Sequence, residues 1–315
     1  MNSGKSLILL LFIFITSALT LTTGCGVIID YANDNELYWG ALVAPRFVSP
    51  VKLRVAVAPF VDEVGLGAPE AGANLARLLS EELAKSSELD LVPLEEVKAA
   101  LNTMDISGQI TPEKAAQIGS TLRLNALVIG SVSEVKKYNQ RKGWRRLARF
   151  FTSQREYVDA VLAISAIDIT TGIILVSRAN TGEYNSGPSE KGFFDKGEKG
   201  EFLSQEAMEG SLNEALVESY HRTLNGLAAL PFKARVISTG DRATISFGRD
   251  VGIKPGLEFV RLEVLRTLTN TIGESYQIMG AAVAHLKVVE VDDHSASLEI
   301  MDGQVYPDDI IQAIN

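Results

Sequence analysis

The residues that could do chemistry are few and widely separated along the chain. A single cysteine, Cys25, excludes an internal disulfide bond and a zinc site with two or more sulfur ligands. Adjacent carboxylates such as Glu81 and Glu82 point apart on a helix, so they do not form an acid/base pair. The three histidines are scattered, at His221, His285 and His294. The sequence therefore predicts a protein that is not an enzyme and that holds no metal or cofactor.

Two glycine-rich stretches come close to nucleotide-binding loops, but neither completes the pattern. In residues 65–72, Glu70 replaces the third glycine of the dinucleotide fingerprint, and acidic residues just before this stretch would repel a phosphate. In residues 192–198, Glu198 stands where a P-loop has its lysine. We interpret the first stretch as a turn that positions the helix after it.

Composition and charge are typical of an acidic globular protein. The 315 residues are enough for about two domains, and 46% apolar residues can supply a core for each. The formal net charge is −9, and removal of residues 1–24 would make it −10. This balance argues against nucleic acid as the main partner.

The N-terminal 24 residues have the pattern of an export signal. Lys5 gives a weakly positive start, and residues 7–15 form an apolar core of the expected length. Residues 21–25, Leu-Thr-Thr-Gly-Cys, are similar to a bacterial lipoprotein signal, although Thr22 stands where that pattern prefers leucine. The resemblance implies lipid attachment at Cys25.

Two alternatives to lipid attachment remain open. Residues 7–29 carry no charge and are long enough to cross about 30 Å of hydrocarbon, so they could form an uncleaved membrane anchor. The signal could also be cleaved and the protein released. In the lipoprotein reading, Gly26 after the cysteine implies the outer membrane, with the folded part on the periplasmic side. Residues 25–50, with Pro45 and Pro50, then form a tether.

Residues 51–230 alternate between strand and helix patterns. Leu75, Leu78, Leu79 and Leu83 share one helix face, and Thr111 followed by Pro112 predicts a helix start. The order of elements predicts a mixed-sheet α/β sandwich. Further helices are expected at 94–101, 111–122 and 202–227, and strands at 53–57, 91–92, 125–130, 157–168 and 173–183.

Three short motifs in this part carry a family resemblance. They are residues 54–60 (Arg-Val-Ala-Val-Ala-Pro-Phe), residues 126–131 (Ala-Leu-Val-Ile-Gly-Ser) and residues 166–177, which contain the turn Ile-Thr-Thr-Gly. Together they resemble the TolB N-terminal and curli-secretion (CsgG/HfaB-like) group over about residues 51–230. The resemblance implies the fold more strongly than the function.

Two segments bear on a channel function. In the curli channel, the segments that match residues 134–156 and 178–203 form membrane-spanning hairpins. Residues 185–200 carry proline, glycine and frequent charges, which disfavours strands that face lipid. A ring-forming secretion-channel subunit, and with it a homo-oligomer, is therefore the alternative function.

The first of these segments contains a cluster of basic and aromatic residues. If it is helical, its apolar side chains form one stripe flanked by arginines, which could lie on an anionic membrane or bind an acidic partner. It could equally be a solvated loop at the end of the sheet. Lys136 and Lys137 begin the cluster, and its candidate contact residues are Arg141, Trp144, Arg145, Arg146, Leu147, Arg149 and Phe151.

Residues 231–315 have the pattern of a small closed barrel. Five or six short strands with turns at regular spacing, two of them expected at residues 257–265 and 281–291, predict this fold. Residues 248–259, rich in glycine, and residues 286–291 resemble the SH3-like C-terminal domain of the flagellar assembly protein FlgT. The sequence thus predicts a periplasm-facing outer-membrane lipoprotein that binds envelope proteins during envelope or surface-appendage assembly.

Lipid attachment at Cys25 has a direct test. We expect a fatty-acid analogue fed to cells to label the wild-type chain and not the Cys25→Ser variant, because acylation needs the sulfur. In-gel fluorescence of the purified protein measures the label. Equal labelling of the two proteins would contradict the lipoprotein prediction.

Overall fold

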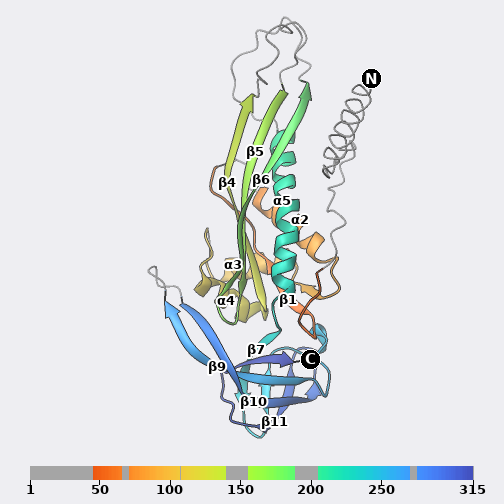
Figure 1. Cartoon of the computed structure of the whole chain (residues 1–315), viewed down its shortest axis with the longest axis vertical. Helices are drawn as coiled ribbons and strands as arrows, with labels where there is room; N and C mark the ends of the chain where they lie inside the picture. The colour runs from red at the N-terminus through yellow and green to blue at the C-terminus, as the bar shows by residue number, and fades with distance from the viewer. Residues whose placement is uncertain are drawn as a thin grey trace, which may run out of the picture. The chain divides into compact units, whose positions relative to one another are not determined.

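The computed structural model describes residues 45–65, 71–106, 108–139, 155–188, 205–269 and 275–314. These residues belong to one compact unit, Leu37–Asn315. A mixed sheet with helices comes first along the chain, and a closed barrel of six antiparallel strands follows it (Figure 1). The predicted combination of a mixed α/β part with a small all-β barrel is thus confirmed, while the SH3-like detail stays a prediction.

The mixed sheet has the strand order β3-β1-β4-β5-β6, and the short strand β2 also pairs with β4. Strand β1 runs parallel to both β3 and β4, whereas β4, β5 and β6 form an antiparallel meander. The strands are β1 (Leu53–Val57), β2 (Val61–Asp62), β3 (Leu89–Leu91), β4 (Ala126–Asn139), β5 (Arg155–Asp168) and β6 (Ile174–Pro188).

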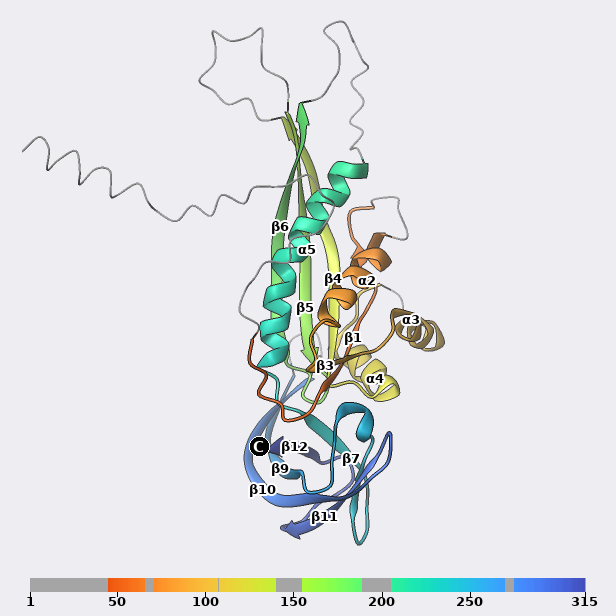
Figure 2. The ribbon, with the colours of Figure 1, turned by 90° about the vertical axis from the view of Figure 1, so that its right-hand side faces the viewer.

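Alternation along the strands gives the sheet two apolar faces. Val55 and Val57 of β1 belong to one buried cluster with α2 and α5, whereas Ala56 and Ala58 belong to another with α3 and α4. Successive side chains of a strand point to opposite faces, so the two clusters lie on the two sides of the sheet. Figure 2 shows these helices, which are α2 (Ala71–Leu83), α3 (Leu94–Thr103), α4 (Pro112–Leu122) and α5 (Gln205–Ala228).

The predicted helix signals are confirmed. Leu75, Leu79 and Leu83 are buried on α2, and the Thr111 side chain caps α4 by accepting a hydrogen bond from the backbone N–H of Lys114. None of the helices in the described ranges is long and apolar enough to span a membrane.

Helix α5 packs very closely on the sheet because small residues meet there. A Cβ atom on Gly182 of β6 would lie 1.9 Å from the backbone oxygen of Ser211. About two turns further along α5, the buried Asn180 Nδ2 donates to Ser219 Oγ over 2.7 Å, and this hydroxyl donates to the Ala215 carbonyl over 2.7 Å. The contact therefore fixes both the distance and the register between α5 and β6.

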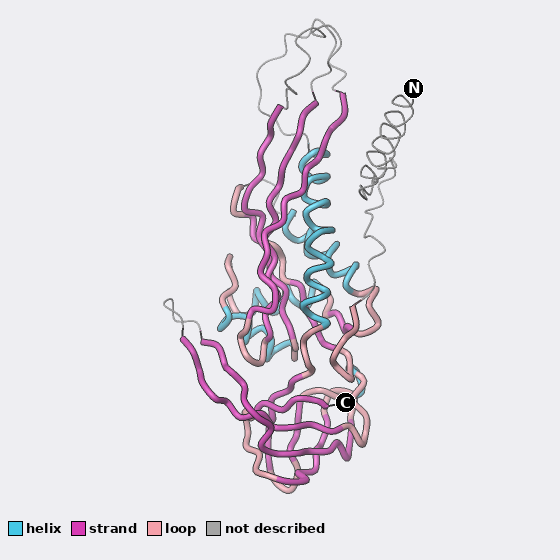
Figure 3. The backbone as a smooth tube through the Cα atoms, viewed as in Figure 1, coloured by secondary structure: helices cyan, strands magenta, loops and turns pink. Residues whose placement is uncertain are grey.

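The barrel closes in the order β10-β11-β8-β7-β12-β9, with β9 paired to β10. Figure 3 shows its strands in magenta around the C-terminus. Phe232 lies at its centre, with the rings of Phe247 and Phe259 edge-on at 5.0 and 6.3 Å between centroids. Its strands are β7 (Lys233–Thr239), β8 (Ala243–Ile245), β9 (Glu258–Thr269), β10 (Ser275–Val291), β11 (Ala296–Asp302) and β12 (Ile310–Ile314), and the short 3₁₀ helix η1 is Arg249–Val251.

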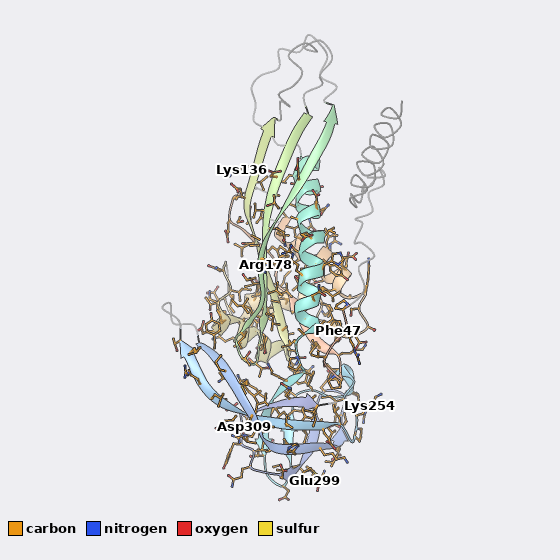
Figure 4. All side chains as sticks on the ribbon, in the orientation of Figure 1. Phe47, Lys136, Arg178, Lys254, Glu299 and Asp309 are labelled. Carbon is orange, nitrogen blue, oxygen red and sulfur yellow. The ribbon has the colours of Figure 1, made fainter. Side chains whose placement is uncertain are left out.

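Several strands are longer than the sequence predicts. Lys136 and Lys137, which the sequence analysis places at the start of a helical or loop segment, instead lie on β4 opposite Asp159 and Val158. Figure 4 labels Lys136 on this strand, where it forms an ion pair with Glu134. The reason is that the ladder with β5 continues without a break beyond the bulge near Glu134.

The close packing of α5 predicts a loss of stability in Gly182→Ala. We expect the free energy of unfolding to fall by roughly 1–3 kcal/mol, because the added methyl group must push α5 away from the sheet. Urea denaturation followed by circular dichroism measures this change. Gly240→Ala is the matched control, since a Cβ atom there has no atom within 4 Å. An equal loss of stability in both variants would contradict close packing of α5 at Gly182.

Candidate partner-binding site

The binding residues predicted from the sequence lie outside the described residues. They are Cys25 and the basic and aromatic residues Arg141, Trp144, Arg145, Arg146, Leu147, Arg149 and Phe151. Their roles in lipid attachment and surface contact therefore stay predictions.

The three histidines do not converge. His221 is on α5, His285 is on β10 and His294 is in the turn that follows β10. Within the ranges that the structure describes, no three His, Cys, Asp or Glu side chains are placed to hold a metal ion.

A buried carboxylate joins the sheet to the barrel. Asp168, at the end of β5, is only 2% exposed and accepts hydrogen bonds from the Thr170 N–H (2.9 Å) and the Thr171 hydroxyl (2.7 Å). It also accepts from Lys233 Nζ over 2.7 Å, and Lys233 is the first residue of β7. A buried ion pair of this kind is tolerated because other hydrogen bonds satisfy the carboxylate oxygens.

Further hydrogen bonds fix the same junction. Asn125 accepts from the Arg54 N–H over 2.9 Å through its side-chain oxygen, and its amide donates to the Lys233 carbonyl over 2.9 Å. Arg235 of β7 donates to the Thr170 carbonyl over 2.8 Å. The turn after β5 and the first barrel strand are therefore held in one arrangement.

A second contact between the two parts involves Asp250 of η1. Burial raises the pKa of Asp250, but hydrogen bonds from His294 and from the N–H groups of Gly248 and Val251 outweigh this effect, so the pKa is below its usual value. The His294 ring lies 2.8 Å from the Asp250 carboxylate, and Arg123 at the end of α4 lies 3.8 Å from it. The carboxylate thus stays ionised beside a cation from the sheet domain.

Strands β9 and β10 continue beyond the barrel as a two-stranded arm, residues 262–269 and 275–282. Its β10 edge contacts the sheet domain, because the Gln277 N–H donates to the Thr171 carbonyl over 2.9 Å and the Ser275 N–H donates to Glu113 over 3.3 Å. The arm is therefore held at its side as well as at its base.

One face of the arm is apolar and exposed. Arg266 and Leu268 lie on one side of β9, and Ile278 shares that side because it pairs with Arg266. Leu265 is on this side too, since a Cβ atom on Gly280, two residues after Ile278, would meet the Leu265 side chain. A register shift at this point places Val264, which pairs with Met279, on the other side. The apolar side chains on this side are exposed, by 62% (Leu265), 43% (Leu268) and 37% (Ile278). We call these three residues the apolar arm face. Contiguous exposed apolar side chains of this kind are typical of protein–protein contacts.

The sequence does not predict the arm. The strand patterns end at Leu265 and begin again at Ala281, so no strand is expected for the residues between them. Thr267, Leu268 and Thr269, followed by Tyr276 and Ile278, have high strand propensity and could have signalled the extension.

The comparison with protein families identifies the class of protein. Residues 46–229 match the family model described as "Curli production assembly/transport component CsgG". The match covers more than half of the chain, which therefore belongs to the CsgG family. The predicted resemblance is confirmed, and the family's description supports a role in envelope assembly.

Similar solved structures include three bacterial proteins. A hypothetical protein, CT253 from Chlamydia trachomatis, is 15% identical over 56% of this chain and 98% of its own, with a TM-score of 0.34. Lipoprotein GNA1162 from Neisseria meningitidis is 14% identical over 44% and 88%, with a TM-score of 0.32. The LpoB C-terminal domain from Escherichia coli is 15% identical over 46% and 88%, with a TM-score of 0.29. No curated protein matches the chain.

The buried ion pair predicts a large effect of Lys233→Met. We expect this variant to lose about 3 kcal/mol of stability, because it leaves the Asp168 carboxylate buried without its cation. The double variant Asp168→Asn, Lys233→Met should recover part of the loss, since it removes the uncompensated charge.

Urea denaturation measures these changes. Arg77→Met is the matched control, because it breaks an exposed ion pair with Glu81 on α2 and should cost less than about 1 kcal/mol. Equal losses in Lys233→Met and Arg77→Met would contradict a special role for the Asp168–Lys233 pair.

Proposed function

We propose that this protein is an outer-membrane lipoprotein that faces the periplasm and acts as a protein-binding assembly factor rather than an enzyme. Its lipid would be attached at Cys25, and residues 26–50 would tether the folded part to the membrane. Its partners would be envelope proteins that take part in envelope or surface-appendage assembly. Membership of the CsgG family supports this class of role.

The observation that carries the proposal is the apolar arm face. Leu265, Leu268 and Ile278 are exposed on a hairpin that contributes little to the barrel core. Removing apolar surface from water contributes about 25 cal/mol per Å², so a partner that covers these side chains gains binding energy. The face therefore has the properties of a contact surface.

The hydrogen bonds between the arm and the sheet domain add a reason why such a contact would be effective. The hydrogen bonds from Ser275 and Gln277 hold the arm against Glu113 and Thr171 before any partner arrives. A surface that is already ordered loses less conformational entropy on binding. The arm would thus present its apolar face in a fixed orientation.

The proposal predicts that Leu268→Ser combined with Ile278→Ser weakens partner binding. We expect crosslinked partners to be recovered at least about tenfold less from cell envelopes, because each buried Leu or Ile contributes about 1.5–3 kcal/mol. Affinity purification after crosslinking, with quantitative mass spectrometry, measures the recovery.

The matched control is Ile237→Ser combined with Met301→Ser. Both residues are exposed and apolar on barrel strands but lie outside the arm. The control should recover the same partners as the wild-type protein, and unfolding curves should show that both variants are folded. Unchanged recovery with the arm variant would overturn the proposal.

A further inference from the structure

A groove runs between β6 and the last turns of α5. It has a volume of about 460 Å³ and is lined by residues 175–178 of β6 and by Arg222, Asn225 and Gly226 of α5. Figure 4 labels Arg178, which lies on β6 beside the helix. The groove thus combines a strand on one side with a helix on the other.

Strand β6 is the last strand of the sheet, and among the described residues it pairs only with β5. The Glu183 N–H donates to the Glu214 carboxylate of α5 over 2.6 Å, so this N–H points away from β5. The N–H and C=O of one residue in an antiparallel strand share a direction, which alternates from residue to residue.

The same alternation fixes which other backbone groups are open. The ladder between β5 and β6 has no register shift from Val176 to Asn185. Ser177, Ala179 and Thr181 therefore point their N–H and C=O groups away from β5, as Glu183 does. No described residue pairs with them on that side. They form an open hydrogen-bonding edge directly beside the groove.

The charge of the groove comes from two arginines. Side chains at even positions of β6 face α5, as Asn180 does by its hydrogen bond to Ser219, so Arg178 also points to the α5 side. Arg222 bonds Glu218 over 2.6 Å, whereas the Arg178 side chain has no hydrogen bond or ion pair with any described residue. The groove is therefore locally basic in a chain of net charge −9.

We propose that this groove binds an extended acidic peptide segment of a partner protein, which adds to β6 as a further strand. The backbone of the peptide would pair with Ser177, Ala179 and Thr181. Its residue opposite Arg178 would point toward α5, where an Asp or Glu side chain meets both arginines. Its residue opposite Val176 would be small and apolar, since Val176 packs against Gly226. This surface is separate from the apolar arm face, so the proposal does not depend on the proposed function.

The test uses two fluorescent nine-residue peptides of Thr, Ser and Val, one with a central Asp and one with a central Lys. Fluorescence anisotropy with the full chain in detergent measures binding. We expect the Asp peptide to bind at least about tenfold more tightly than the Lys peptide. Arg178→Glu should reverse this preference, while Arg77→Glu, an exposed arginine on α2, should leave it unchanged.

A second pair of variants tests the open edge. Ala179→Pro removes an N–H that makes no bond to β5, so the sheet should keep its ladder while peptide binding falls at least tenfold. Ala179→Thr keeps the N–H and should bind like the wild-type chain. Circular dichroism verifies that both variants are folded.

Three outcomes would overturn the proposal. The first is that neither peptide binds the wild-type chain. The second is that Arg178→Glu and Ala179→Pro bind the Asp peptide as well as the wild-type chain does. The third is that light scattering shows the wild-type chain to self-associate and the Ala179→Pro variant not to. A second copy of the chain, and not a partner peptide, would then occupy the edge of β6.

Discussion

The buried carboxylate of Asp168 is the group on which the arrangement of the folded parts depends. It closes the turn after β5, and through Lys233 it fixes the first residue of the barrel. The same turn supplies the Thr170 carbonyl for Arg235 and the Thr171 carbonyl for the arm. Because a charge buried without its partner is strongly destabilising, the sheet, the barrel and the arm are coupled through this one side chain.

The helices divide the sheet into covered and open regions. Close contact at Gly182 brings α5 against β6, so the helix covers one face of this strand but leaves its outer edge open. The arm differs, because its edge is occupied by the sheet domain while its apolar face stays in solvent. The two exposed surfaces therefore favour different contacts, one through backbone groups and charge, the other through apolar side chains.

Local patterns predicted most of the fold, whereas contacts between distant residues could not be read from the sequence. Alternation identified β1 and β5, the leucine spacing identified α2, and Thr111 marked the start of α4. Asp168 and Lys233 are far apart in the chain, and neither has a local signal that assigns it a partner. The lengths of β4, β9 and β10 were underestimated because strand pairing, rather than propensity, decides where these strands end.

The hydrogen bond from the Glu183 N–H to Glu214 has a consequence for solubility. A long open edge strand is a template for aggregation, and proteins commonly protect such edges with charged groups. Glu214 occupies the edge at Glu183, so continuous stacking of a second strand along all of β6 is blocked there by a fixed negative charge. The Glu214 carboxylate thus limits strand addition to a short stretch of β6 and disfavours fibre growth.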